Sequence, residues 1–222
     1  MKIDILTLFP EMFNDIFSCS IIKRAIDLGK VEINLFNFRD YSDDIHNKVD
    51  DTPYGGGSGM VLKCQPIFDC IDKIKTEDSK VILLTPSGKS YNQDIAYDLS
   101  KLKHIILICG HYEGFDERIC SICDMQLSIG DYVLTGGEIP AMVLVDSITR
   151  LIPGVINEES HLDDSFSRSK LLDYPTYTKP RIYRGMAVPD VLLSGDHKKI
   201  NEYRINESIK KTKEVRPDLL EK

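Results

Sequence analysis

The stretch Ile105–Ala141 reads IILICGHYEGFDERICSICDMQLSIGDYVLTGGEIPA, and the fold of the chain is organised around it. Its first apolar run, Ile105–Cys109, is typical of a buried strand and is followed by a glycine. A second short apolar stretch near Leu127 leads into the glycine-rich segment Ile129–Gly137, and an apolar helical pattern follows. Ligands of open α/β sheets bind in loops just beyond the carboxyl ends of strands. The stretch therefore predicts two such loops at one ligand-binding edge.

Strand and helix patterns alternate through the first 150 residues. We expect strands at Lys2–Phe9, Val31–Phe38, Lys80–Leu84 and His104–Cys109. We expect helices at Met12–Leu28, Pro66–Ile74 and Asn92–Leu102. The polar segment Arg39–Met60 is long enough to be a functional or mobile loop. This alternation predicts an α/β fold whose parallel sheet is covered by helices on both faces.

The composition is that of a globular protein. The chain has 222 residues, of which 42% are hydrophobic and 28% charged, and no apolar run reaches the roughly 18 residues that span a bilayer. No cleavable leader pattern follows the first residues, so we expect a cytoplasmic protein that does not enter the membrane. Cys120 and Cys123 form a lone C-x-x-C, which favours packed thiols over a metal site. We predict no dedicated metal ligand.

The charge is distributed unevenly along the chain. Residues 1–160 carry 15 Lys and Arg against 25 Asp and Glu, whereas residues 161–222 carry 13 against 10. The pattern also changes near residue 160, so we expect domains at 1–160 and 161–222, the second with a helix at Lys198–Lys213. Its mildly basic balance permits phosphate contacts, although a solvated surface is the alternative for each cation. The candidates are Arg168, Lys170, Lys179, Arg181, Arg184, Lys198 and Lys199.

Three candidate loops follow the expected strands: Thr85–Gly88, Gly110–Gly114 and Ile129–Gly137. None contains the Walker motif or the G-x-G-x-x-G fingerprint, which argues against the ordinary ATP and dinucleotide sites. Any one of them could be a generic glycine turn. Three loops that meet at one sheet edge favour a shared ligand pocket.

Longer motifs carry a specific resemblance. GHYEGFDER at Gly110–Arg118, SIGDYVLTGGE at Ser128–Glu138 and VDDTPYGGGSGM at Val49–Met60 resemble the bacterial tRNA (guanine-N1)-methyltransferases, the TrmD family of the SPOUT superfamily. Further matches are LFPEMF at Leu8–Phe13, DSITRLIPG at Asp146–Gly154, DDSF at Asp163–Phe166 and VLLSGDH at Val191–His197. The motifs span almost the whole chain in the family's order, so the resemblance is specific.

The resemblance implies a SPOUT-type α/β domain at 1–160 with a trefoil knot, which periodicity alone would not suggest because true knots are rare. It also implies a small helical, tRNA-binding domain at 161–222 and a homodimer. The substrate would be tRNA, methylated at N1 of the guanosine just 3′ of the anticodon (G37). The loop Pro53–Gly59 reads by composition as a flexible linker; the resemblance suggests that it contacts tRNA or the partner subunit.

The resemblance also implies a binding site for S-adenosylmethionine. Its first loop would contribute Gly110, Glu113 and Gly114. Its second loop would contribute Ile129, Gly130, Asp131, Tyr132, Val133, Leu134, Gly136 and Gly137. Pro86 and Pro140 would form apolar walls. Mg²⁺ is implied as well, facing Glu113 or Asp164, because this ion keeps several waters and needs only one or two carboxylates.

Asp164 matches the family's general base, and Arg150 matches the arginine near guanine O6. Guanine N1 bears a proton at neutral pH, so a base must remove it while a cation stabilises charge growing on O6. Asp163 is the alternative base, because the sequence does not say which carboxylate points inward. Locally, either aspartate could instead cap a helix beginning at Ser165, and Arg150 could be only a helix C-terminal cation.

Two other functions stay open at this point. One is a non-catalytic RNA-binding or nucleotide-sensing protein on the same fold, which the loss of Arg150 or Asp164 would have favoured. The other is a methyltransferase acting on rRNA or on a ribose hydroxyl. Ribose methylation removes no N1 proton, so the DDSF segment counts against it. His111 stands where many relatives carry arginine, and we assign it no charge-dependent role.

Overall fold

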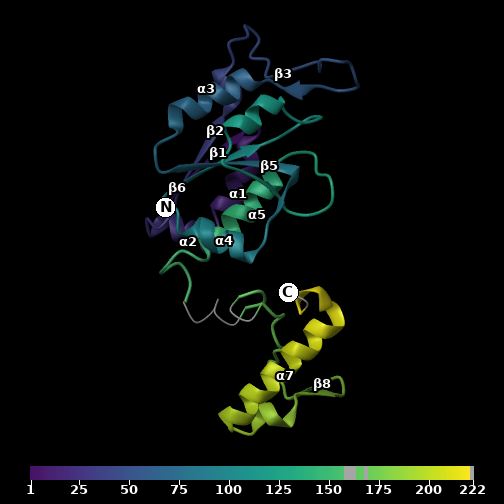
Figure 1. Cartoon of the computed structure of the whole chain (residues 1–222). Helices are drawn as coiled ribbons and strands as arrows, with labels where there is room; N and C mark the ends of the chain where they lie inside the picture. The colour runs from purple at the N-terminus through teal and green to yellow at the C-terminus, as the bar shows by residue number, and fades with distance from the viewer. Residues whose placement is uncertain (158–163, 168–169, 221–222) are drawn as a thin grey trace. The chain divides into compact units, whose positions relative to one another are not determined.

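The computed structural model describes residues 1–157, 164–167 and 170–220. It divides into two compact units, Met1–Ile156 and Asn157–Lys222 (Figure 1), which are described separately below. From the sequence we expected a boundary near residue 160. Among the described residues, none of the helices has both the length and the apolar character needed to cross a bilayer.

The first unit is built on a sheet of five strands. Their order across the sheet is β2 (Glu32–Asn37), β1 (Lys2–Thr7), β6 (His104–Cys109), β5 (Ser79–Ser90) and β7 (Met125–Ser128). Every neighbouring pair is parallel. All residues of the central strand β6 are buried, as a strand covered on both faces requires. The parallel sheet expected from the sequence is confirmed.

Helices cover both faces of this sheet, so successive residues of each strand enter different cores. Leu107 packs in one core and its neighbour Ile106 in the other. Helices on the first face are α1 (Asn14–Phe17), α2 (Ser20–Asp27), α4 (Gln93–Ser100) and α5 (Glu138–Thr149). The second face is covered by α3 (Cys64–Ile74) and the 3₁₀ helix η3 (Glu117–Ile122). Figure 1 shows α3 and α5 on opposite sides of the strands.

The single helix expected at Met12–Leu28 is wrong, because this segment is broken. A 3₁₀ turn, η1 (Pro10–Phe13), is followed by α1 and, after Ser18, by α2. The Ser18 hydroxyl donates to the Asp15 carbonyl at 3.0 Å, and Ser20 has a left-handed φ of 54°. Side-chain bonds of this kind compete with the helix for backbone groups, which explains the break.

Strand β5 is longer than its apolar run predicted. The register against β7 shifts between Leu84 and Lys89, so Thr85–Gly88 forms a bulge inside β5 instead of a loop beyond it. A side chain on Gly88 would lie 2.5 Å from the backbone nitrogen of Leu127. Glycine therefore permits the close approach of the two strands here.

The polar segment Arg39–Met60 contains more regular structure than expected. It holds most of the 3₁₀ helix η2 (Phe38–Tyr41), as well as strand β3 (Asp50–Asp51), which pairs antiparallel with β4 (Val61–Leu62). Leu62 in turn forms a bridge to Phe115. The remaining loop between β3 and β4 is thus attached at its base to the segment that follows β6.

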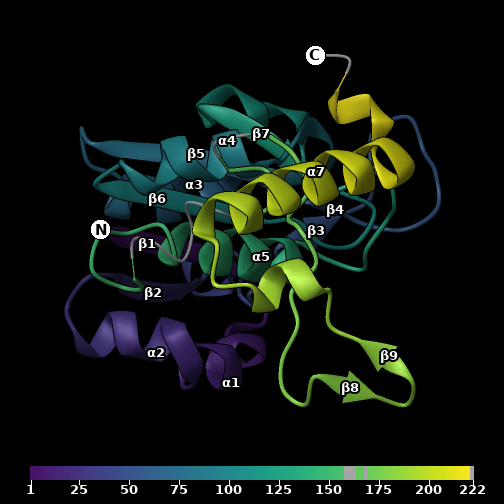
Figure 2. The same cartoon turned by 90° about the horizontal axis from the view of Figure 1, so that it is seen from below.

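The second unit contains the long helix α7 (His197–Val215), near the expected Lys198–Lys213. Asp196 caps its start by accepting from the backbone N–H groups of Lys198 and Lys199. Before it come a hairpin of β8 (Ile182–Tyr183) and β9 (Met186–Ala187) and a 3₁₀ turn, η4 (Asp190–Leu193). A last 3₁₀ turn, η5 (Pro217–Leu219), follows α7. In Figure 2 the hairpin projects away from α7.

Candidate active site

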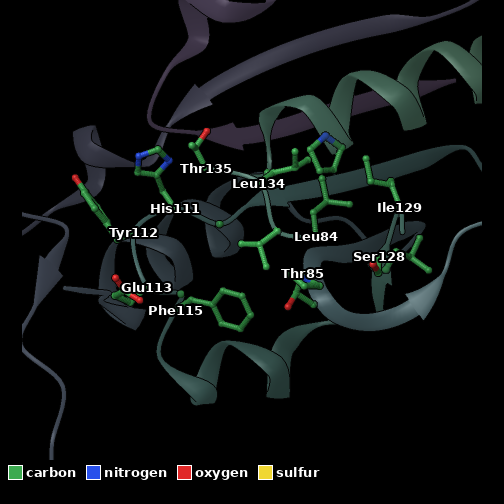
Figure 3. A pocket seen from close by; sticks show the side chains of 18 of the residues that line it. Leu84, Thr85, His111, Tyr112, Glu113, Phe115, Ser128, Ile129, Leu134 and Thr135 are labelled. Carbon is green, nitrogen blue, oxygen red and sulfur yellow. The ribbon is translucent and has the colours of Figure 1, made fainter. Parts of the chain in front are cut away.

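A cavity opens beside the bulge of β5 and at the carboxyl ends of β6 and β7, where three segments distant in sequence meet (Figure 3). It encloses about 340 Å³, a volume within the range of small-molecule sites. The bulge of β5, the loop after β6 and the loop after β7 form its wall. We call it the loop cavity. The convergence of the three candidate loops, expected from the sequence, is what creates it.

The loops after β6 and β7 are joined through their backbones. His111 and Gly136 form an antiparallel bridge, and the Gly137 N–H donates to the Gly110 carbonyl at 2.8 Å. A side chain on Gly137 would lie 2.6 Å from the Cα of Cys109. Only glycine allows α5 to begin this close to the end of β6. The two loops therefore form one continuous wall.

A buried carboxylate supports this wall from below. Glu138 is the first residue of α5 and only 2% exposed. The Thr7 hydroxyl donates to its Oε1 at 2.8 Å, and the Phe9 N–H donates to the Thr7 hydroxyl at 2.9 Å. Burial, with a contribution from the Glu138 charge, raises the pKa of the neighbouring Cys109 thiol. The end of β1 thus holds the start of α5 in place.

His111 lines the cavity between two aromatic rings. Its ring centroid lies 4.9 Å from that of Phe9 and 4.9 Å from that of Tyr112, the latter edge-on. Its Nδ1 is buried and has no hydrogen-bond partner within the described part of the chain. A side chain on Gly136 would contact both this Nδ1 and Glu138 Oε2. Two polar side-chain atoms therefore converge behind the second loop, and the buried His111 Nδ1 still requires a hydrogen-bond partner.

The residues that the resemblance assigned to the cofactor gather around this cavity, with one exception. Asp131 is exposed and does not line it. The others that line it are Pro86, Gly110, Glu113, Gly114, Ile129, Gly130, Tyr132, Val133, Leu134, Gly136, Gly137 and Pro140. Their assignment to S-adenosylmethionine stays a prediction.

The cavity also includes residues that our reading of the sequence did not single out. Examples are Val61, Tyr112, Phe115, Glu117 and Thr135. Tyr112 and Phe115 belong to the motif GHYEGFDER, so the motif itself was the available signal. Val61 comes from β4 and reaches the cavity only through the pairing of its neighbour with Phe115. No pattern in the sequence around Val61 predicts such a long-range contact.

The loop Pro53–Gly59 is attached to the rim of the cavity. The Glu113 N–H donates to the Met60 carbonyl at 3.1 Å, and the Leu62 N–H donates to the Gly114 carbonyl at 3.0 Å. A side chain on Gly59 would overlap that of Glu113. The tip remains open, with Tyr54 fully exposed. Contact of this loop with tRNA or a partner subunit stays a prediction.

The two residues predicted to act on the base belong to different units. Arg150 is the C-cap of α5, and its N–H donates to the Asp146 carbonyl at 3.3 Å. Asp164 is half-buried in the second unit, and its carbonyl accepts from the Ser167 hydroxyl at 2.6 Å. Residues 164–167 form a turn, so a helix beginning at Ser165 is wrong. The alternative base Asp163 and the candidate cation Arg168 lie outside the described residues.

Five of the six cysteines are buried or half-buried thiols, and Cys19 is exposed. All six are free. Cys123 donates from its Sγ to the Ile119 carbonyl at 3.1 Å, and burial raises its pKa to about 12. A thiol of this kind is protonated at neutral pH. The interpretation of Cys120 and Cys123 as packing residues is therefore confirmed, since both lie against the second core.

Comparison with known proteins identifies the family of the chain. The family described as tRNA (Guanine-1)-methyltransferase TrmD matches residues 1–222. A tRNA (guanine-N(1)-)-methyltransferase of Dictyoglomus turgidum is 57% identical over 222 residues, covering all of this chain and 91% of the relative. One of Malacoplasma penetrans is 58% identical over 219 residues (99% and 96%), and one of Macrococcus caseolyticus is 59% identical over 223 residues (100% and 92%). The chain belongs to the tRNA (guanine-N1)-methyltransferase family.

Proposed function

We propose that the chain transfers a methyl group from S-adenosylmethionine to N1 of G37, the guanosine just 3′ of the anticodon in tRNA. The observation that carries this proposal is the loop cavity. It draws its lining from three separate motifs, and residues assigned to the cofactor from the sequence lie around it. The family supports a methyl transfer to guanine N1 of tRNA.

The cavity suits S-adenosylmethionine by its chemistry. Glycine backbone in both loops can donate to and accept from the adenine and ribose, because no side chain stands between. Pro86, Ile129 and Leu134 give apolar surface for the adenine ring. When bound, the cofactor supplies a methyl group on a sulfonium cation.

Two residues of the chain are proposed to activate the guanine for methylation at N1. In this proposal Asp164 accepts the N1 proton, so that the N1 lone pair becomes available to the methyl group. Arg150 donates to O6, where negative charge develops as the proton leaves. A guanidinium suits this role better than an ammonium, since its planar fork holds a fixed orientation. Asp163 remains the alternative base.

Mg²⁺ is part of the proposal, and Glu113 or Asp164 would face it. The described residues contain no group of three or more side chains arranged to hold a metal. Mg²⁺ requires only one or two carboxylates and keeps its remaining waters, so a single glutamate on the cavity rim fits this ion.

The remaining features inferred from the family are a trefoil knot in the first unit, tRNA binding by the helical second unit, a homodimer and a cytoplasmic location. The dimer is supported by Ile139 and Val143, one turn apart on α5, which are 47% and 41% exposed. Apolar side chains at this spacing form a stripe that a second copy of the chain can cover. Six free thiols suit a reducing compartment.

The test is transfer of labelled methyl from S-adenosylmethionine to two tRNA transcripts that differ only in having G or A at position 37. We expect label in the G37 transcript and none above background in the other. Equal labelling of both transcripts would refute the G37 assignment. Absence of label from both, with a tRNA of proven folding, would refute the activity itself.

A further inference from the structure

The β8–β9 hairpin of the second unit is an exposed arm. Every residue from 176 to 187 is exposed, including Tyr183 at 56% and Met186 at 66%. Figure 2 shows this hairpin projecting from α7. A bare two-stranded hairpin is only marginally stable, and natural proteins seldom leave clustered apolar side chains in water without a use. The arm therefore has the features of a contact surface.

Three side chains at its tip form a common surface. Tyr183 and Met186 are direct partners across the hairpin, so their side chains share one face. The guanidinium of Arg184 lies 5.3 Å from the centroid of the Tyr183 ring, within the range of a cation–π contact. We call Tyr183, Arg184 and Met186 the tip face. It presents an exposed aromatic ring with a guanidinium over it.

The turn that carries the tip face departs from the usual residue choice. Arg184 and Gly185 both have positive φ, at 50° and 81°, as the two central residues of a type I′ turn require. The first of these positions normally holds Asn, Asp or Gly. An arginine there is unfavourable for the backbone, and such local conflicts are typical of functional positions.

The charge around the hairpin points to a polyanion. Residues 174–189 contain Lys179, Arg181 and Arg184 but no Asp or Glu, in a chain whose net charge is −7. Arg181 is paired with Asp190 at 2.9 Å, whereas no ion pair of Arg184 occurs among the described residues. Exposed aromatic rings interleaved with cations are what single-stranded nucleic acid requires, because bases stack on the rings and phosphates attract the cations.

We propose that the tip face stacks on an unpaired base of the tRNA, with the Tyr183 ring as the platform and Arg184 against the adjoining phosphate. This inference rests on the proposed function for the identity of the RNA. An unpaired base is the fitting target, since the bases of an A-form helix are stacked and its major groove is too narrow to read. The hairpin thus adds a contact that is independent of the loop cavity.

The test compares Tyr183→Ile with Tyr183→Trp in the full-length protein, by fluorescence anisotropy with labelled tRNA. Isoleucine keeps the strand preference and apolar character but removes the ring, whereas tryptophan keeps a stacking surface. We expect Tyr183→Ile to weaken binding about five- to a hundred-fold and Tyr183→Trp to bind like the unmodified chain. In turnover, Tyr183→Ile should raise KM for tRNA and leave kcat unchanged.

A matched control is available in the first unit. Tyr97 is 54% exposed, and Lys101 lies 4.0 Å from its ring centroid, so Tyr97→Ile removes an equivalent ring with an equivalent cation. This variant should bind tRNA normally. Arg184→Gln should lower the slope of log binding constant against log salt by about 1, as expected for one lost phosphate contact. Tyr183→Trp should leave that slope unchanged.

Several outcomes would overturn the stacking role: normal tRNA binding by Tyr183→Ile, binding by Tyr183→Trp as weak as that of Tyr183→Ile, or an equal loss on a duplex RNA without unpaired bases. The result is separable from the proposed activity. A protein that binds tRNA through Tyr183 but transfers no methyl group would refute the activity alone. Normal methylation with an unchanged KM in Tyr183→Ile would refute the hairpin contact alone.

Discussion

At the scale of single residues, the proposed methyl transfer depends on which side chain accepts the proton of guanine N1. We propose that Asp164 accepts this proton, and its carboxyl belongs to a half-buried turn in the second unit. Asp164→Asn keeps the size and hydrogen-bonding geometry of the side chain but cannot accept a proton. We expect kcat to fall about 100-fold or more while the dissociation constant of S-adenosylmethionine, measured by calorimetry, stays unchanged.

The control for this variant is Asp163→Asn, which should retain nearly normal turnover. The opposite pair of results, a slow Asp163→Asn and a normal Asp164→Asn, would transfer the role of base to Asp163. A loss of cofactor binding in Asp164→Asn would mean that this carboxylate supports the cofactor site and would argue against a purely catalytic role.

Another residue-scale prediction concerns the support beneath the loop cavity. Thr7→Val replaces the hydroxyl by a methyl group of similar size, so Glu138 loses a donor and the Phe9 N–H loses an acceptor. Unsatisfied buried groups of this kind cost about 1–3 kcal/mol. We expect the urea midpoint to fall at constant m-value, and Thr7→Ser, which keeps the hydroxyl, to unfold near the midpoint of the unmodified chain. Equal midpoints for Thr7→Val and Thr7→Ser would contradict the proposed support.

At the scale of elements, the start of β5 is attached by hydrogen bonds to the residue that precedes β7, in addition to the strand pairing around its bulge. Asp124, just before β7, accepts from the Val81 N–H at 2.8 Å and from the Lys80 ammonium at 3.1 Å. Partial burial opposes the charged form, but these bonds outweigh it and lower the pKa of Asp124 below its ordinary value. A carboxyl with a lowered pKa stabilises the fold above the unfolded-state pKa of about 3.9.

That stabilisation disappears as the pH falls below this value through the folded-state pKa. We therefore expect Asp124→Asn to lower the free energy of unfolding by about 1 kcal/mol at pH 7, and the gap to the unmodified chain to shrink below pH 4. Thermal melts at pH 7 and pH 3 measure both values. A gap that is the same at the two pH values would show that the charge of Asp124 does not stabilise the pairing of β5 with β7.

At the scale of the whole molecule, the proposed dimer depends on the exposed stripe of α5. Val143→Glu places a charge on that stripe, and burying it against a second copy would be costly. We expect this variant to sediment as a monomer, whereas the unmodified chain sediments at twice the mass of one chain. Ile45→Glu is the control, since Ile45 is 91% exposed away from α5. An unmodified chain that is active as a monomer would refute the dimer.

Local sequence determined much of this protein. An alternating run rich in Ile and Leu identified β1, and the apolar run Ile105–Cys109 identified β6, because a strand covered on both faces is mostly apolar. Asn92, whose side chain accepts from the Ile95 N–H at the start of α4, and Gly29, which has a left-handed φ after α2, are further local features that their residue types favour. The motifs around Gly110 and Gly136 indicated the family, and they contain most of the residues that line the cavity. Such features depend on residues close together in the chain.

Tertiary structure alone decided the rest, because it depends on contacts between distant residues. The hydrogen bond from Thr7 to Glu138 joins positions 131 residues apart, and the place of Val61 in the cavity depends on the bridge from Leu62 to Phe115. The bulge of β5 likewise follows from the register against β7. Sequence periodicity reports which residues are apolar and polar, whereas register and close approach depend on which partners the fold brings together.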